Sequence, residues 1–324
     1  MKFSRFAFSA VAVAASLAAT VPASASTVAV ADMNIFAMGL FSAGGVPFGP
    51  GNGTIAISNE SRTGTAAANY NGVAAGGLGA NSITSGGAAV VDVKNRCIGD
   101  CAAALALYAG GGGLENNLFT HLGAPGTANF ALGDMFISGT ALGGGITGLT
   151  RANAMTSGPT NEGGANATVL NGARLNGDFT VGTTFTGVIG LGVDWFLRAY
   201  VDSVSPASGI ANAGIGWTIR ITSTGANGDP LFVPLVFSPD DLNQTAFSTN
   251  FSENQVLQDN NSAFGIGQFY FSQLRTYDET KTYNFSINQS SNASVSEIPE
   301  PASLALMGLG LVGLAAMRRR KIRQ

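Results

Sequence analysis

The sequence predicts an all-β body, organised as a β-sandwich or a jelly-roll-like fold. Apolar segments in its second half alternate with polar residues, as in a strand that buries one face. Separators rich in Gly and Asn have turn chemistry and divide these segments. No helical period of useful length competes with this pattern.

The first 25 residues predict a secretory signal peptide. Lys2 and Arg5 give it a positive start, and residues 6–21 are almost wholly apolar. A cleavage site of the small-x-small type runs from Ala23 to Ala25, so we expect signal peptidase to cut after Ala25. This segment is therefore excluded from the fold.

The first half of the mature body carries few bulky side chains. Residues 28–39 predict an opening strand. Residues 42–90 are rich in Gly, Ala, Ser, Thr and Asn, and predict loops with weak strands near 54–58 and 90–93. An Ala/Leu-rich stretch at 101–108, followed by glycines, predicts a short helix.

The second half has clearer periodicity. Residues 139–177 are again rich in Gly, Asn and Thr, and predict a long, mobile insertion. Residues 184–204 predict a long strand, and residues 215–222 alternate apolar with polar around Trp217. Further strands are expected at 230–238, 264–274 and 282–287.

The last 28 residues combine Pro299-Glu300-Pro301, an uncharged apolar run at 302–317 and a basic end. The basic residues are Arg318, Arg319, Arg320, Lys321 and Arg323. A spanning helix needs about 20 apolar residues, so this run predicts a short single transmembrane helix. The positive end is expected on the cytoplasmic side of the inner membrane, which places the body on the opposite, exported side. The alternative is a buried C-terminal core helix.

This order of motif, apolar run and basic cluster resembles the sorting signal of bacterial PEP-CTERM proteins. The resemblance covers 28 of 324 residues. It implies recognition and cleavage by a membrane-embedded exosortase in a Gram-negative bacterium that makes extracellular polysaccharide. It divides the chain into a signal peptide at 1–25, an exported β-rich domain at 26–296 and a sorting signal at 297–324.

The body also resembles, more weakly, the EDSAP-motif group of PEP-CTERM proteins. The likeness rests on residues 129–135, the Trp217 strand and the strand that begins near Tyr283. The motif that names the group is not intact, and residues 154–159 stand in its place. That group has no known activity, so this likeness supports the fold.

Processing changes the charge of the protein. The whole chain has 16 basic and 19 acidic residues. The signal peptide removes two basic residues and the tail removes five, which leaves nine basic against 19 acidic. Charged residues are only 11% of the chain, so hydroxyl and amide groups keep the surface hydrated. A nucleic-acid partner is disfavoured, because phosphate binding requires clustered Lys and Arg.

Cys97 and Cys101 are the two cysteines. Outside the inner membrane a disulfide between them persists and closes a small loop. Free thiols, or a metal or redox role, are the alternatives. A metal site needs more ligands nearby, and the single histidine, His121, is 20 residues away.

Catalytic signals are weak. A Ser-His-Asp triad requires His121, and neither a Gly-x-Ser-x-Gly elbow nor a His-Glu-x-x-His motif is present. A pair of carboxylates supports glycoside cleavage. The candidates are Asp194, Asp202, Asp240 and Asp241.

Loop oxygens and aromatic rings offer two binding chemistries. Residues 240–243 and 259–261 supply hard oxygen ligands for calcium, without the spacing of an EF-hand. Plain turns are the favoured interpretation of both segments. Trp195, Trp217 and Tyr270 are candidates for stacking on sugar rings. Trp217 lies on the apolar face of its strand, so for this ring packing in the core is favoured.

The sequence therefore predicts a non-enzymatic, exported protein of the cell surface or extracellular matrix. Its expected role is structural or adhesive and is linked to extracellular polysaccharide, as in a biofilm. No catalytic or metal site and no cofactor is expected. The alternative function is a secreted carbohydrate-active hydrolase. The expected partners are signal peptidase, an exosortase-type enzyme, the inner membrane transiently, and polysaccharide.

Overall fold

The computed structural model describes residues 26–45, 54–85, 90–106, 128–143, 145–157, 164–202, 208–224, 232–249, 255–258 and 267–298. Within these residues the chain forms 15 strands, one α-helix and one 3-10 helix. The predicted all-β class is confirmed. The helices are α2 (Cys101–Ala106) and η1 (Asp240–Leu242).

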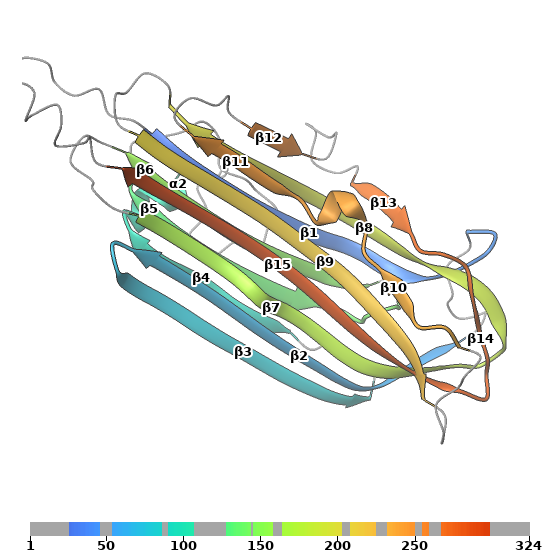
Figure 1. Ribbon diagram of the computed structural model, residues 1–324. Helices are drawn as coiled ribbons and strands as arrows, with labels where there is room; N and C mark the ends of the chain where they lie inside the picture. The colour runs from blue at the N-terminus through green and yellow to red at the C-terminus, as the bar shows by residue number, and fades with distance from the viewer. Residues whose placement is uncertain are drawn as a thin grey trace, which may run out of the picture.

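The strands form two antiparallel sheets that lie face to face, an arrangement consistent with a β-sandwich (Figure 1). Sheet A has the order β12–β8–β1–β6–β5–β4, and β13 and β14 also pair with β8. Its strands are β1 (Ser26–Ser42), β4 (Val91–Gly99), β5 (Phe130–Ser138), β6 (Thr147–Ser157), β8 (Phe185–Val201), β12 (Gln255–Gln258), β13 (Gln268–Phe271) and β14 (Arg275–Tyr277).

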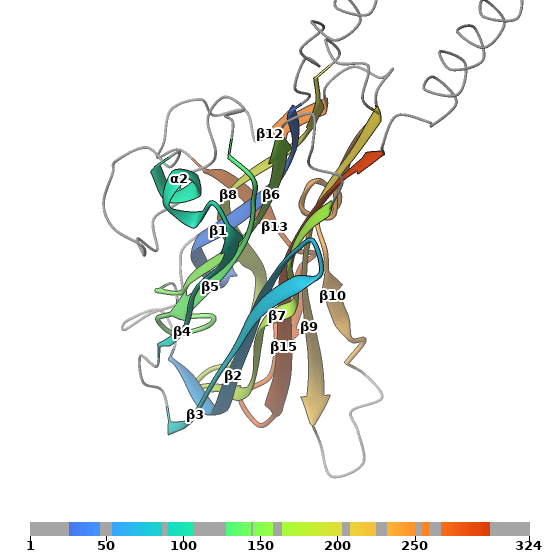
Figure 2. The ribbon, with the colours of Figure 1, turned by 90° about the vertical axis from the view of Figure 1, so that its left-hand side faces the viewer.

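Sheet B has the order β10–β9–β15–β7–β2–β3, and β11 also pairs with β9. Its strands are β2 (Ile55–Tyr70), β3 (Val73–Ser85), β7 (Gly164–Val181), β9 (Ser208–Thr224), β10 (Leu235–Phe237), β11 (Thr245–Thr249) and β15 (Thr282–Ile298). Figure 2 shows the two sheets nearly edge-on, with α2 outside sheet A.

The main core lies between the sheets, because alternate residues of each long strand point inward. Met33 of β1 and Trp217 of β9 are 0% and 1% exposed. Phe179, Tyr277 and Tyr283 form an aromatic group inside one end, and the Phe179 and Tyr283 rings stack with centroids 5.1 Å apart. The alternation around Trp217, predicted from the sequence, is thus a core-facing pattern.

Two predictions about the weakly patterned segments were wrong. Residues 139–177 were expected to be a mobile insertion, but they contain β6 and most of β7. Residues 42–90 were expected to be mostly loops; the strands expected near 54–58 and 90–93 are confirmed as the starts of β2 and β4, but β2 continues to Tyr70 and β3 follows it.

The strand period is present in small side chains: Ala66 and Ala68 of β2 are buried, with Ala67 exposed between them. Small side chains let the two sheets approach closely here, because a Cβ on Gly133 of β5 would lie 2.7 Å from the Ala67 carbonyl oxygen.

The short helix begins at Cys101 as predicted and is described as far as Ala106. No helix among the described residues is long and apolar enough to cross a membrane. The predicted signal peptide at 1–25 and the apolar run at 302–317 lie outside the described residues.

Candidate functional site

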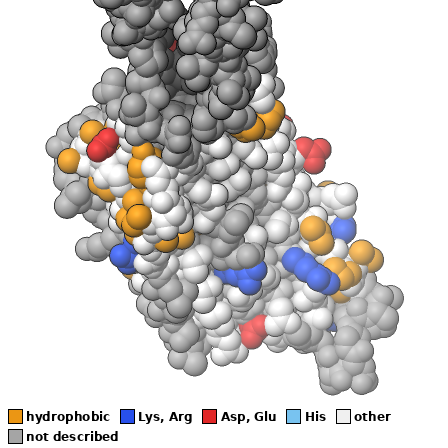
Figure 3. Space-filling view, turned by 60° about the vertical axis from the view of Figure 1, so that its left-hand side comes forward, with side chains coloured by type: hydrophobic (Ala, Val, Ile, Leu, Met, Phe, Trp, Pro, Cys, Tyr) orange, Lys and Arg blue, Asp and Glu red, His pale blue; other side chains and the backbone are white. Residues whose placement is uncertain are grey.

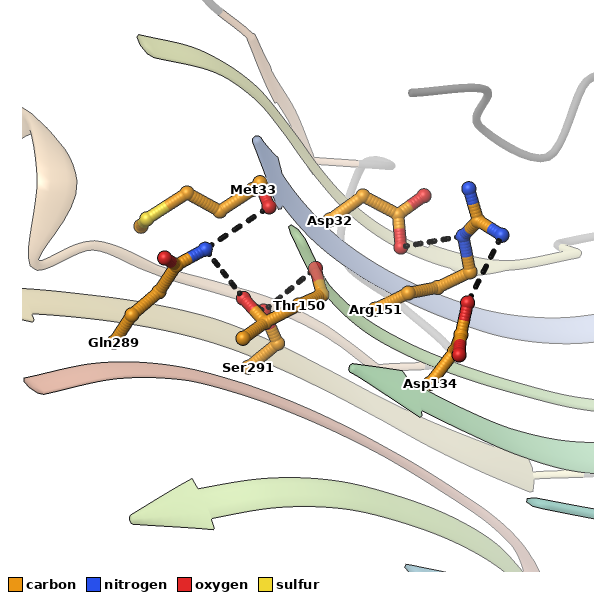
Figure 4. Close-up of polar contacts among 7 residues, drawn as sticks. All are labelled: Asp32, Met33, Asp134, Thr150, Arg151, Gln289 and Ser291. Carbon is orange, nitrogen blue, oxygen red and sulfur yellow. Dashed lines mark hydrogen bonds and ion pairs between the residues drawn. The ribbon is translucent and has the colours of Figure 1, made fainter. Parts of the chain in front are cut away.

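A buried charged group lies across three neighbouring strands of sheet A. Asp32 of β1 pairs in register with Arg151 of β6, and Arg151 pairs in register with Asp134 of β5. Arg151 Nε is 3.8 Å from Asp32 Oδ1, and Arg151 Nη1 is 3.7 Å from Asp134 Oδ2 (Figure 4). The arginine therefore stands between two carboxylates.

This group belongs to the outer face of sheet A. On β1, Ala31 and Met33 point into the main core, so Asp32 points the opposite way, with Val28 and Val30. Ala104 of α2 packs against the same outer surface. Both carboxylates are 0% exposed, so this group does not reach a ligand in solution.

Burial dominates the electrostatics of Asp32. Desolvation raises the pKa of Asp32 to about 7, and the Asp134 carboxylate adds to the rise. The Arg151 guanidinium and a hydrogen bond with the Asn153 side chain act in the opposite direction. Two carboxylates and one guanidinium leave a net negative group in a dry site, which is costly unless a proton is bound.

A second polar group joins the two sheets inside the sandwich. Gln289 Nε2 of β15 donates to the Met33 and Gly148 carbonyls and to Thr150 Oγ1, at 3.1, 3.2 and 3.1 Å (Figure 4). Thr150 Oγ1 lies 2.9 Å from Ser291 Oγ. A β-bulge between Gln289 and Ser291 accompanies this contact, and Gly148 leaves the space, because a Cβ there would be 2.9 Å from Gln289 Oε1.

The outer face of sheet B is polar and hollowed. Side chains of β2, β7, β15 and β9 stand in cross-strand rows on this face, and most of them are Asn, Ser or Thr. One hollow of about 500 Å³ is lined by Asn59, Asn176, Gly177, Asp178, Arg220, Thr222, Asn284, Phe285 and Ser286. A second hollow, of about 570 Å³, is lined by Asn69, Asn71, Gly72, Gly164, Ala165, Asn166, Ser294 and Val295.

Asp178 is held in place within the first hollow. Asn59 Nδ2 donates to Asp178 Oδ2 at 2.9 Å, and Asn284 Nδ2 donates to Asp178 Oδ1. Arg220 is exposed on the same face. The hollow therefore presents amides, hydroxyls, one oriented carboxylate and one guanidinium to solvent.

The four carboxylates named as hydrolase candidates lie in two parts of the chain, β8 with the residue that follows it and η1. Asp194 is half-buried in β8, and desolvation raises the pKa of its carboxyl. Asp202 follows β8, while Asp240 and Asp241 are exposed in η1. Asp241 Oδ2 accepts a long hydrogen bond of 3.4 Å from the Tyr270 hydroxyl.

The predicted calcium ligand Asn243 holds the backbone together. Its Oδ1 accepts from the Trp217 N–H at 3.1 Å, and its Nδ2 donates to the Trp217 carbonyl at 3.0 Å. The same amide nitrogen donates to the Ser238 hydroxyl and to the Pro239 carbonyl. Among the described residues, no three His, Cys, Asp or Glu side chains are grouped to hold a metal ion. The amide group of Asn243 is therefore used in hydrogen bonds within the protein, as expected of a residue in a plain turn.

Two of the three proposed sugar-stacking rings are inaccessible. Trp217 is 1% exposed, which confirms the expected core packing of its ring. Trp195 is 7% exposed and also belongs to the core, so its prediction as a stacking ring was wrong. Tyr270 is half-buried, and its hydroxyl donates to Gln268 Oε1 at 2.6 Å. Large apolar rings are valuable in the core, which explains why strand tryptophans point inward.

Cys97 and Cys101 form a disulfide, with Cα atoms 5.8 Å apart. The bridge connects β4 to the first residue of α2. Cys97 packs beside the apolar cluster on the outer face of sheet A that contains Val28, Val30 and Ala104. The other predicted site residues lie outside the described residues. They are Ala23, Ala25, His121, residues 259–261, Pro299, Glu300, Pro301 and the basic end.

Sequence reasoning missed Asp32, Asp134, Arg151 and the sheet B hollows. A signal for the carboxylates was present, because Asp32 and Asp134 each interrupt an otherwise uncharged strand. Such a residue is a candidate for a buried ion pair.

The comparisons with known proteins bear on the tail. Residues 297–321 match the family model described as the PEP-CTERM protein-sorting motif. Comparisons with curated proteins and with solved structures gave no match. The motif carries the information on export and sorting, while the body must be interpreted from its geometry.

Proposed function

We propose, from the premise that this chain carries a PEP-CTERM sorting signal, that it serves as a structural or adhesive protein of the extracellular polysaccharide. The motif supports export, transient anchoring in the inner membrane and processing by an exosortase-type enzyme. The processed body then resides at the cell surface or in the matrix and works by binding polymer without a catalytic step.

The outer face of sheet B is the observation that carries this proposal. Its rows of amides and hydroxyls both donate and accept hydrogen bonds, as the hydroxyl groups of sugars require. Its two hollows lie on one continuous face spanned by β7 and β15. Charged residues are only 11% of the chain, and few of them stand among the described side chains of the face in Figure 3, so polymer contact costs little desolvation of ions.

Alanine replacement of Pro299, Glu300 and Pro301 tests the sorting step. We expect the altered protein to remain uncleaved in the inner membrane, because the processing enzyme no longer recognises it. Fractionation of producer cells, with immunoblotting for size, measures this. The matched control replaces Gln273, Leu274 and Glu279, which are exposed, with alanine. Release of the motif variant into the medium or matrix at normal size would show that the tail does not direct sorting.

Polysaccharide isolated from the producer tests the binding role. We expect the processed protein, purified from the producer, to cosediment with this polymer and to leave its chain length unchanged. Size-exclusion chromatography of the polymer measures the second point. Shortening that is abolished by Asp194→Asn or Asp241→Asn would support the hydrolase alternative, and failure to cosediment would remove the adhesive role.

A further inference from the structure

One cross-strand row of side chains in the first hollow ends in the exposed Arg220. Arg220 of β9 stands in register beside Ser286 of β15, and Ser286 stands beside Asn176 of β7. Asp178 and Asn284 form the adjacent row. Arg220 makes no ion pair within the described part of the chain, so its guanidinium faces the hollow with its donors available.

The charge balance of this face differs from that of the whole body. At the described outward positions of β2, β7, β9 and β15, the charged side chains are Arg174, Arg220 and Asp178. The face therefore has an excess of positive charge, although the mature body has nine basic against 19 acidic residues. Arg220 is the cationic side chain that lines the first hollow, so an anionic group that enters the hollow is attracted to it.

Asp178 determines on which side of the hollow an acidic group can bind. Its carboxylate already accepts hydrogen bonds from Asn59 and Asn284, which fixes its direction. It repels a second carboxylate nearby, and β15 separates it from Arg220. A ligand with one acidic group thus places that group on the β9 side of the hollow.

We propose that this hollow binds an acidic saccharide, with a sugar carboxylate on Arg220 and sugar hydroxyls on the amides and hydroxyls beside it. This inference rests on the proposed polysaccharide-binding function and names the class of sugar. A guanidinium binds a carboxylate through two parallel hydrogen bonds, which makes it more selective than an ammonium group. The volume of about 500 Å³ lies in the range of sites that hold small ligands.

Alginate oligosaccharides, which consist of uronic acids, are the probe. Isothermal titration of the processed protein compares them with the same oligosaccharides after reduction of every carboxyl to an alcohol. We expect binding of the acidic form that weakens when NaCl is raised, and roughly 10- to 100-fold weaker binding of the reduced form. Arg220→Gln is expected to weaken binding of the acidic form by a similar factor, and Arg220→Lys by less.

Arg275→Gln is the matched control, because it removes the same charge from β14 on sheet A. It is expected to leave binding unchanged, and urea unfolding midpoints confirm that the variants are folded. Equal binding of acidic and reduced oligosaccharides, or no effect of Arg220→Gln, overturns the inference. Cosedimentation with the producer's own polymer then decides separately whether the broader function survives.

Discussion

Arg151→Met is expected to lower the free energy of unfolding by about 3–5 kcal/mol at pH 7. Methionine fills similar space but removes the guanidinium that lies beside the buried Asp32 and Asp134 carboxylates. Each must then remain ionised in a dry site or take up a proton against the solution pH. Urea unfolding followed by tryptophan fluorescence measures the loss, since Trp195 and Trp217 are both in the core.

The same variant is expected to lose less stability at pH 5, where protons neutralise the carboxylates more readily. Arg174→Met is the matched control, because Arg174 is exposed on sheet B, and it should change the unfolding free energy by less than about 1 kcal/mol. An Arg151→Met effect as small as that of the control, or equal at both pH values, would show that the arginine does not neutralise this group.

The sequence was most informative where large side chains mark the strand period. β8 and β9 were predicted because residues such as Leu191, Trp217 and Ile219 alternate with small or polar ones. β2 and β7 use Ala at many inward positions, and Ala has a low strand propensity, so the same period was hidden. Their identity as strands depends on the facing sheet, which no local pattern reveals.

The candidate sites depend on register more than on local sequence. Asp32, Asp134 and Arg151 come together only because β6 pairs with β1 on one side and β5 on the other. A one-residue slip of β6 would turn Arg151 into the main core. The first hollow on sheet B has the same origin, because pairing of β9 and β7 with β15 places Arg220 and Asp178 on its two sides. Composition indicated a surface of amides and hydroxyls, but it did not indicate their arrangement.

We expect the free energy of unfolding of the natural protein to fall as pH rises from about 4 to 8, and Asp32→Asn to remove most of this fall. Burial raises the pKa of Asp32 from 3.8 to about 7 in the folded protein, and the unfolded chain keeps the lower value. Between these values the folded state holds a proton that the unfolded state has released, so stability falls as pH rises through this window. A rise of about three pKa units corresponds to about 4 kcal/mol. The asparagine variant should therefore be more stable than the natural protein at pH 8, and similar to it near pH 4.

The difference in unfolding free energy between the two proteins, measured by urea titration from pH 4 to pH 8, isolates Asp32 and its coupling to Asp134 from the other titrating groups. Glu60 and Asp194 also have pKa values raised by desolvation, but they are common to both proteins and cancel. Asp278→Asn provides the control, because hydrogen bonds from Thr280 lower the pKa of that carboxyl below 3.8, so its contribution changes only below pH 4 and the difference should stay constant from pH 4 to pH 8. A constant difference for Asp32→Asn across the range would mean that Asp32 keeps its charge in the folded protein. Arg151 would then neutralise Asp32 more strongly than Asp134, and the group would be a full ion pair with one additional carboxyl.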